Sequence, residues 1–314
     1  MLSVEEKWSV AVPGDRVNQI LSDPASQSVY AGDGWGVSHA ALRLHRLDLA
    51  TGRPLADIRT RHQGVSALAL HGDHLYAATD SRLFQLTRED LSVVAQWDKG
   101  LIRYCMTLIP QGGAFVMANW RTASVGIFDP ATGRTRRLNV GLQPVIVRHG
   151  SELKAIAGFD GGISTLGIDP PKVTSTSPTP PVANAAGGDQ VWATLAGPPE
   201  GGQGEPPVWT RRPTSTIVRL TSDPMTVVLP EAVGKLVSDD ARGLIWCISE
   251  EAIAIVEQRT GRVAGSVSLP KGKKVAHLDP EGNLAFTLES HVEAANGVLI
   301  KSWSTLTCYA TKVE

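Results

Sequence analysis

The chain has 314 residues, with 30 Lys and Arg against 31 Asp and Glu, which leaves a formal net charge of −1. Hydrophobic residues make up 42% and charged residues 19%, the balance of a globular protein rather than a disordered or fibrous one. The near-neutral charge argues against a strongly basic nucleic-acid-binding surface, so no direct nucleic-acid partner is expected.

A unit of two apolar segments joined by a tight turn recurs along the chain. Each turn carries the Gly, Pro, Asp or Asn that a β-hairpin requires. The first segments begin near residues 17, 65, 102, 143, 183, 235 and 275, and the third of them is predicted to run from Tyr104 to Ile109. The spacing of about 40 residues is the size of one propeller blade.

A second repeated element supports this period. Residues 48–53 (DLATGR) and 129–134 (DPATGR) are nearly identical, and 258–262 (QRTGR) is a shortened copy. In each, Gly supplies a positive φ and Thr bonds its own backbone, as in a turn between two strands. Each unit is therefore predicted to contain four strands.

These units predict an all-β fold, a seven-bladed β-propeller with four antiparallel strands per blade. Residues 7–12 precede the first blade directly, so they are predicted to form the outermost strand of the last blade and to close the ring. The tail, 306–313, then leaves two alternatives. It is either the third strand of that blade after a long loop, which we favour, or the fourth strand with the N-terminal segment as a fifth.

Residues 169–216 interrupt the rhythm, because they hold ten of the 20 prolines. Proline cannot donate to a strand ladder, so a Pro- and Gly-rich loop insertion within a single propeller domain spanning 1–314 is predicted. Residues 176–181 would link blades four and five, and residues 197–207 would connect the second and third strands of blade five. The stretch is either a surface connection or a docking peptide of polyproline II character.

The compartment and chemistry are inferred from what the sequence contains. Cys105, Cys247 and Cys308 are widely spaced in apolar runs, where a cysteine acts as a small buried hydrophobe, and this favours a cytoplasmic location. No signal peptide and no apolar run long enough to span a membrane are visible. No cofactor is expected.

The pattern resembles the superfamily of WD-repeat, YVTN-type and quinoprotein-like propellers, chiefly through the DxxTGR turns at 48–53 and 129–134. The resemblance covers nearly the whole chain and implies a fold and a capacity to bind partners. The Trp-Asp pair of WD repeats occurs only at Trp97-Asp98, and the recurrent tryptophan of quinoprotein blades is missing. The resemblance therefore implies no particular substrate.

In a propeller, the links between blades and the connections between second and third strands emerge on the same face, called the top face. In this chain these connections contain arginine, tryptophan and histidine, which are typical of interface anchors. The alternative is that these are ordinary polar loops in which the tryptophans pack locally. The predicted partner-binding residues are Trp35, His39, Arg61, His62, Arg103, Trp120, Arg121 and His291.

An acid or amide recurs where the second strand of a unit ends: Asp33, Asp80, Asn119, Asp160, Glu250 and Glu289. Such a ring of oxygen ligands would suit Ca²⁺, but recurrence in almost every unit favours side chains that cap their own turns, so no metal site is predicted. His71 and His74 flank a hairpin turn and are too few for a zinc site. Arg134, Arg136 and Arg137 are predicted to lie on a solvated outer strand, with phosphate binding there as a local possibility.

These observations predict a non-enzymatic scaffold that binds a protein or peptide partner through its top-face loops as a subunit of a larger complex. No catalytic residue is assigned. The alternative is a propeller hydrolase or lyase, similar to lactonases, with a site at the central channel and His39, His62 and His291 as acid–base candidates. A further alternative is an assembly subunit whose top face is permanently covered. The oligomeric state and the partner's identity stay open.

Overall fold

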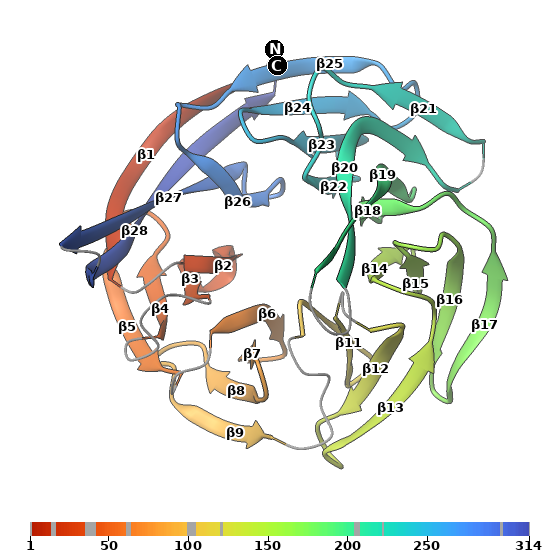
Figure 1. The fold of residues 1–314 in the computed structure, drawn as a ribbon. Coiled ribbons are helices and arrows are strands. Elements are labelled where there is room, and N and C mark those ends of the chain that lie inside the picture. Colours follow the sequence, from red (N-terminus) through yellow and green to blue (C-terminus); the bar gives the residue numbers. More distant parts are fainter. Residues whose placement is uncertain are drawn as a thin grey trace.

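The structure is a computed structural model, and it describes residues 2–13, 17–34, 42–60, 64–98, 105–119, 122–203, 208–221, 223–295 and 298–313. Seven four-stranded antiparallel sheets stand around a central axis and close into a ring (Figure 1). The molecule is therefore a seven-bladed β-propeller, which confirms the predicted fold.

In blades one to six the strands run in chain order from the innermost to the outermost. Blade one contains β2 (Val17–Asp23), a 3₁₀ turn (Pro24–Ser26), β3 (Ser28–Asp33), β4 (Arg43–Asp48) and β5 (Pro54–Arg59). Blade two contains β6 (Val65–His71), β7 (His74–Thr79), β8 (Leu83–Thr87) and β9 (Val93–Trp97), and blade three contains β10 (Thr107–Gln111), β11 (Ala114–Ala118), β12 (Ser124–Asp129) and β13 (Arg134–Asn139).

Blade four contains β14 (Pro144–His149), β15 (Glu152–Ala157), β16 (Ile163–Ile168) and β17 (Pro171–Ser177), and blade five contains β18 (Val182–Ala186), β19 (Trp192–Gln203), β20 (Val208–Arg219) and β21 (Met225–Val228). Blade six contains β22 (Lys235–Asp239), β23 (Leu244–Ile248), β24 (Ala252–Glu257) and β25 (Val263–Ser268). The inner strands begin within a few residues of the predicted positions. The largest difference is in blade three, where β10 starts at Thr107 rather than at Tyr104, which lies outside the described residues.

Blade seven closes the ring between the two ends of the chain. Its strand order is β26 (Lys274–Asp279), β27 (Leu284–Ala295), β28 (Val298–Val313) and then β1 (Leu2–Pro13) on the outside. The tail is therefore the third strand, which confirms the alternative we favoured. The expected long loop before it is instead a β-hairpin, because β27 and β28 stay paired from Leu284↔Ala310 to Ala295↔Val298.

The hydrophobic core consists of seven clusters, and each lies between two neighbouring blades. Side chains alternate between the two faces of a strand, and both faces of a blade are covered by a neighbour. The second strands are accordingly buried along most of their length, as in β3 and β23. The three cysteines are buried and free, as predicted, and burial raises the pKa of Cys105 and Cys247 to about 12.

The repeated turns join the third and fourth strands as predicted. Asp48 accepts hydrogen bonds from the amide and hydroxyl of Thr51, and Gly52 has a φ of +73°. Asp129, Thr132 and Gly133 repeat this arrangement. In the third copy Glu257 takes the place of the aspartate, since it accepts from Thr260 Oγ1 at 2.6 Å while Gly261 has a φ of +69°.

Candidate binding site at the top of the channel

The top face is defined here as the end of the ring at which the innermost strands begin; the opposite end is the bottom face. Because blades one to seven share one strand direction, the links between blades and the connections between second and third strands all lie on the top face. This is the face on which the sequence placed its candidate residues.

The mouth of the central channel at the top face holds a cavity of about 600 Å³. Four blades contribute to its lining: Val17 and Asn18 from blade one, Val65, Ser66 and Asp80 from blade two, Met106 from blade three, and Lys274, Val275, Ala276, Leu288 and Ser290 from blade seven. The inner-strand residues come from the first positions of β2, β6 and β26, so the start of each strand determines which side chains reach the mouth.

The mouth combines apolar walls with a few polar groups. Val17 and Val65 are buried in its wall, whereas Met106 stands exposed at its edge. Lys274 Nζ donates to Glu250 Oε1 at 2.6 Å, and this bond together with the lysine charge lowers the pKa of Glu250. Ser66 Oγ donates to the carbonyl of Ala78. A concave pocket that combines apolar and polar side chains is a candidate binding site.

The hairpin of β27 and β28 forms an arm beside this mouth. Lys274, the first residue of β26, pairs with Leu288, so residues 289–295 continue past the top edge of the innermost strand. His291 stacks on Trp303 across the hairpin, with ring centroids 5.1 Å apart, and its Nε2 lies 2.8 Å from Thr305 Oγ1. These contacts stiffen the arm at its base.

A second arm rises from blade five. Val182, at the start of β18, pairs with Leu195, so residues 196–203 of β19 extend beyond the top edge, paired with β20. The arm contacts blade four, because the guanidinium of Arg211 lies 4.7 Å from the centroid of the Phe159 ring. In Figure 1 the hairpin of β19 and β20 extends from blade five toward the inside of the ring.

The Pro-rich stretch, which was expected to be a loop insertion, consists largely of strands. Residues 171–177 form β17, 182–186 form β18, and 192–203 and 208–219 form the arm. Pro171 is accommodated at the start of the outermost strand β17, and Pro198, Pro199 and Pro213 in an arm whose pairing has several irregularities, where a missing amide donor breaks few ladder bonds. Residues 178–181 do link blades four and five as predicted.

Of the eight predicted partner-binding residues, His291 alone lies in the described part of the chain, on the arm of blade seven. The others lie outside the described residues: Trp35, His39, Arg61, His62, Arg103, Trp120 and Arg121.

The recurrent acids are distributed around the top. Asp33 Oδ2 accepts from the amide of Arg43 across its own turn, as the capping alternative predicts, and Asp160 Oδ2 accepts from the amide of Leu142. Within the described ranges, no three His, Cys, Asp or Glu side chains come together as ligands for one metal ion.

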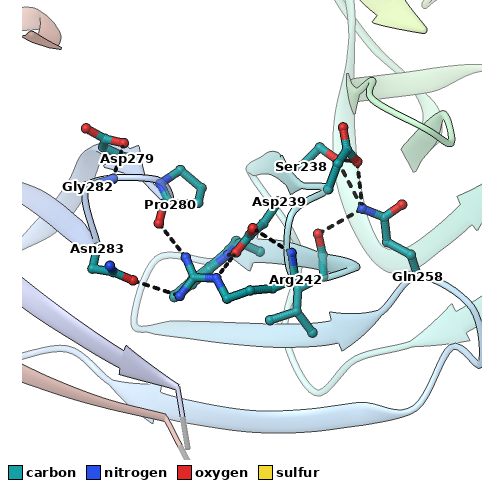
Figure 2. A network of polar contacts seen from close by, with 11 residues as sticks. Ser238, Asp239, Arg242, Gln258, Asp279, Pro280, Gly282 and Asn283 are labelled. Atoms are coloured by element: carbon teal, nitrogen blue, oxygen red, sulfur yellow. Dashed lines mark hydrogen bonds and ion pairs between the residues drawn. The ribbon is translucent and has the colours of Figure 1, made fainter. Parts of the chain in front are cut away.

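On the bottom face, polar contacts join blades six and seven (Figure 2). Arg242 donates to Asp239 Oδ2 at 2.6 Å, to Asn283 Oδ1 at 2.7 Å and to the carbonyl of Pro280. Asp239 is only 2% exposed and also accepts from Trp246 Nε1. Asp239 belongs to blade six, whereas Asn283 and Pro280 belong to blade seven, so Arg242 joins the two blades.

Sequence reasoning missed one polar cluster at the junction of blades seven and one. Ser22 Oγ donates to Asp279 Oδ2 at 2.8 Å and lies 3.0 Å from His277 Nε2. Since the hydroxyl proton is given to the carboxylate, Ser22 accepts from the imidazole N–H, and the imidazole is not positioned as its base. Ser22 lies near the end of β2, and His277 and Asp279 lie at the end of β26. Each strand end looks like the start of an ordinary hairpin turn, so no local pattern marks the cluster.

The fold and the comparisons define the class of protein to which this chain is similar. No protein-family model matches the sequence, and no curated protein matches it. The WD40 domain of Neurospora crassa Pan2 superposes with a TM-score of 0.70 at 10% identity, over 98% of this chain and 95% of that one. BamB from Moraxella catarrhalis superposes with a TM-score of 0.56 at 14% identity, over 96% and 84%.

At these identities the likeness concerns the fold alone. It confirms the resemblance to WD-repeat and quinoprotein-like propellers at that level. Within the described ranges, no helix is long and apolar enough to cross a membrane.

Proposed function

We propose that this propeller is a non-enzymatic scaffold that binds a protein or peptide partner on its top face, as a subunit of a larger complex. The observation that supports this most is the channel-mouth cavity with an arm rising beside it, since Leu288 and Ser290 of that arm line the cavity. A partner bound there would contact both the ring of blades and the arm.

Exposed apolar side chains on the top face support the same proposal. Met106 is 45% exposed, Leu142 42% and Val292 52%. They lie before β10, in the link between blades three and four, and on the arm of blade seven. Large apolar groups surrounded by polar residues are typical of surfaces that are desolvated by a partner.

The test is a comparison of two charge-introducing double variants. Met106→Glu with Val292→Glu changes the top face, whereas Val94→Glu with Val228→Glu changes valines that are at least as exposed, on the outermost strands β9 and β21. Partners captured from native extract are first compared by quantitative mass spectrometry. Affinities for the purified partner are then measured.

We expect the top-face variant to bind at least about tenfold more weakly and the outer-strand variant to bind normally, because buried apolar anchors dominate binding energy. Equal capture by both variants would contradict the proposal. So would a chain that captures no partner but hydrolyses lactones, the outcome expected of the alternative hydrolase.

A further inference from the structure

Two arginines of blade three share one face of an outermost strand. Arg134, Arg136 and Leu138 alternate along β13, and Leu138 packs in the core cluster between blades three and four. Alternate residues of a strand point to the same side, so both guanidinium groups face blade four. Arg137 lies between Arg136 and Leu138 in the sequence and points to the opposite side.

These arginines line a groove of about 660 Å³ between blades three and four. Its opposite wall is formed by Ile168, Asp169, Pro170 and Pro171 of blade four, and one end is the Gly112–Gly113 turn of blade three. Both turns join strands at the bottom face. The groove therefore lies away from the top-face site, so binding to the groove can be tested independently of binding to the top face.

Within the described chain, Arg134 and Arg136 have no ion pair and no side-chain hydrogen bond, whereas other junction arginines such as Arg88 and Arg242 bind carboxylates. Arg148 lies near the glycine turn and donates to Gln111 Oε1 and to the carbonyl of Pro110, which are neutral acceptors. Within the described residues, none of these three arginines at the junction of blades three and four binds a carboxylate.

We propose that this groove binds an extended acidic peptide that runs along β13. Residues two apart on a strand are separated by roughly 6.6 Å, and a second extended chain has the same repeat. Carboxylates at alternate positions of such a peptide would meet Arg134 and Arg136 in register. The planar guanidinium fork binds a carboxylate through two parallel hydrogen bonds, which gives the pairing geometric specificity.

Two aspartates of the groove determine where along it the acidic residues of the peptide would bind. Asp129 is held by its own turn, where it accepts from the amide of Ala131 and from Thr132 Oγ1. Asp169 is exposed in the opposite wall and has no such partner within the described chain. The charge of Asp169 repels an acidic peptide at the turn end of the groove, so the acidic residues of the peptide should lie toward Arg136. Removing the charge of Asp169 should therefore strengthen binding.

The probe is a fluorescein-labelled peptide of four Glu-Ser repeats, followed by fluorescence anisotropy at low ionic strength. We expect Arg134→Gln with Arg136→Gln to weaken binding about tenfold, the effect of losing two exposed ion pairs. Asp169→Asn should tighten binding about twofold. The matched control is Arg137→Gln, which removes one charge from the same strand but from its opposite face, and should change the affinity less than twofold.

Thermal unfolding of each variant checks that the fold is retained, which we expect because all four side chains are solvent-exposed. Equal binding by the wild type and the double variant would overturn the proposal, as would an equal loss in Arg137→Gln. Binding of sodium pyrophosphate that depends on Arg134 and Arg136, with no binding of the peptide, would also overturn it and mark a phosphate site instead.

Discussion

His277 shows how its neighbours change the chemistry of a single residue. It is half-buried between blades seven and one, with Phe286 beside its ring and Ser22 at its Nε2. Desolvation, together with the charge of Lys235, lowers its pKa from 6.5 to about 4, against the opposing effect of Asp279. The ring is therefore neutral at pH 7 and donates its N–H to the serine.

This lowered pKa predicts a loss of stability in acid. The unfolded chain takes up a proton on His277 as the pH falls below 6.5, whereas the folded chain resists until about pH 4, so stability is present above pH 6.5 and declines as the pH falls through that interval. His277→Gln keeps the N–H donor without titrating. Urea unfolding measures the free energy of unfolding, which should fall between pH 7 and pH 5 by up to about 2 kcal/mol more in the wild type than in the variant. An equal fall in the free energy of unfolding for both proteins would show that the folded structure does not keep the imidazole from being protonated.

At the scale of single elements, β1 depends on one tryptophan to hold it in place. Trp8 is buried in the cluster between blades seven and one, its Nε1 donates to the carbonyl of Leu49 at 2.9 Å, and its ring contacts Phe286. Gly52 fits against the indole because a Cβ at that position would lie 2.7 Å from it. The repeated turn of blade one thus also packs against β1, the strand that closes the ring.

Trp8→Ala should therefore lower the free energy of unfolding by about 3 kcal/mol or more, because it leaves a large cavity and an unpaired carbonyl. Val94→Ala, on the outermost strand β9 but exposed, should change it by less than about 0.5 kcal/mol. Urea denaturation curves of both variants provide the measurement. Comparable destabilisation of the two would mean that β1 is not anchored through its indole.

At the scale of the whole molecule, bonds between neighbouring blades complement the seven apolar clusters. Asp23 and Arg88 pair blades one and two at 3.2 Å, His149 and Asp189 join blades four and five, and Arg219 donates from blade five to the carbonyl of Gln258 in blade six. Arg242 makes the equivalent connection between blades six and seven. These polar bonds connect neighbouring blades at four of the seven junctions, in addition to the apolar cluster at each junction.

Arg242→Met should destabilise the protein by about 2 kcal/mol, because the buried carboxylate of Asp239 loses its cation and the link to Asn283 is lost. Arg262→Met removes an ion pair with Glu257 that is formed within one blade and is largely exposed, so its cost should stay below about 1 kcal/mol. Thermal unfolding compares the two variants. A loss for Arg262→Met as large as that for Arg242→Met would argue against a special role for the junction.

Much of the fold was predictable because its signals are local. The turns at 48–53 and 129–134 have their Asp, Thr and Gly in one short segment, and a strand reveals its two faces by alternation. The arm of blade five was missed because proline normally argues against strands. The candidate site was predicted only as a face of the propeller. His291 is the sole predicted partner-binding residue in the described part of the chain, and of the residues that line the cavity only Asp80 had been singled out, as one of the recurrent acids.

The sequence by itself determined the number of blades, the position of the repeated turns and the burial of the cysteines, because each depends on residues close together in the chain. Only the tertiary structure decided which side chains of different blades meet. Ser22 reaches Asp279, 257 positions away, and Arg136 shares a groove with Pro171 of the next blade. Such contacts depend on how the ring closes and how neighbouring blades pack, and no local pattern of residues encodes that geometry.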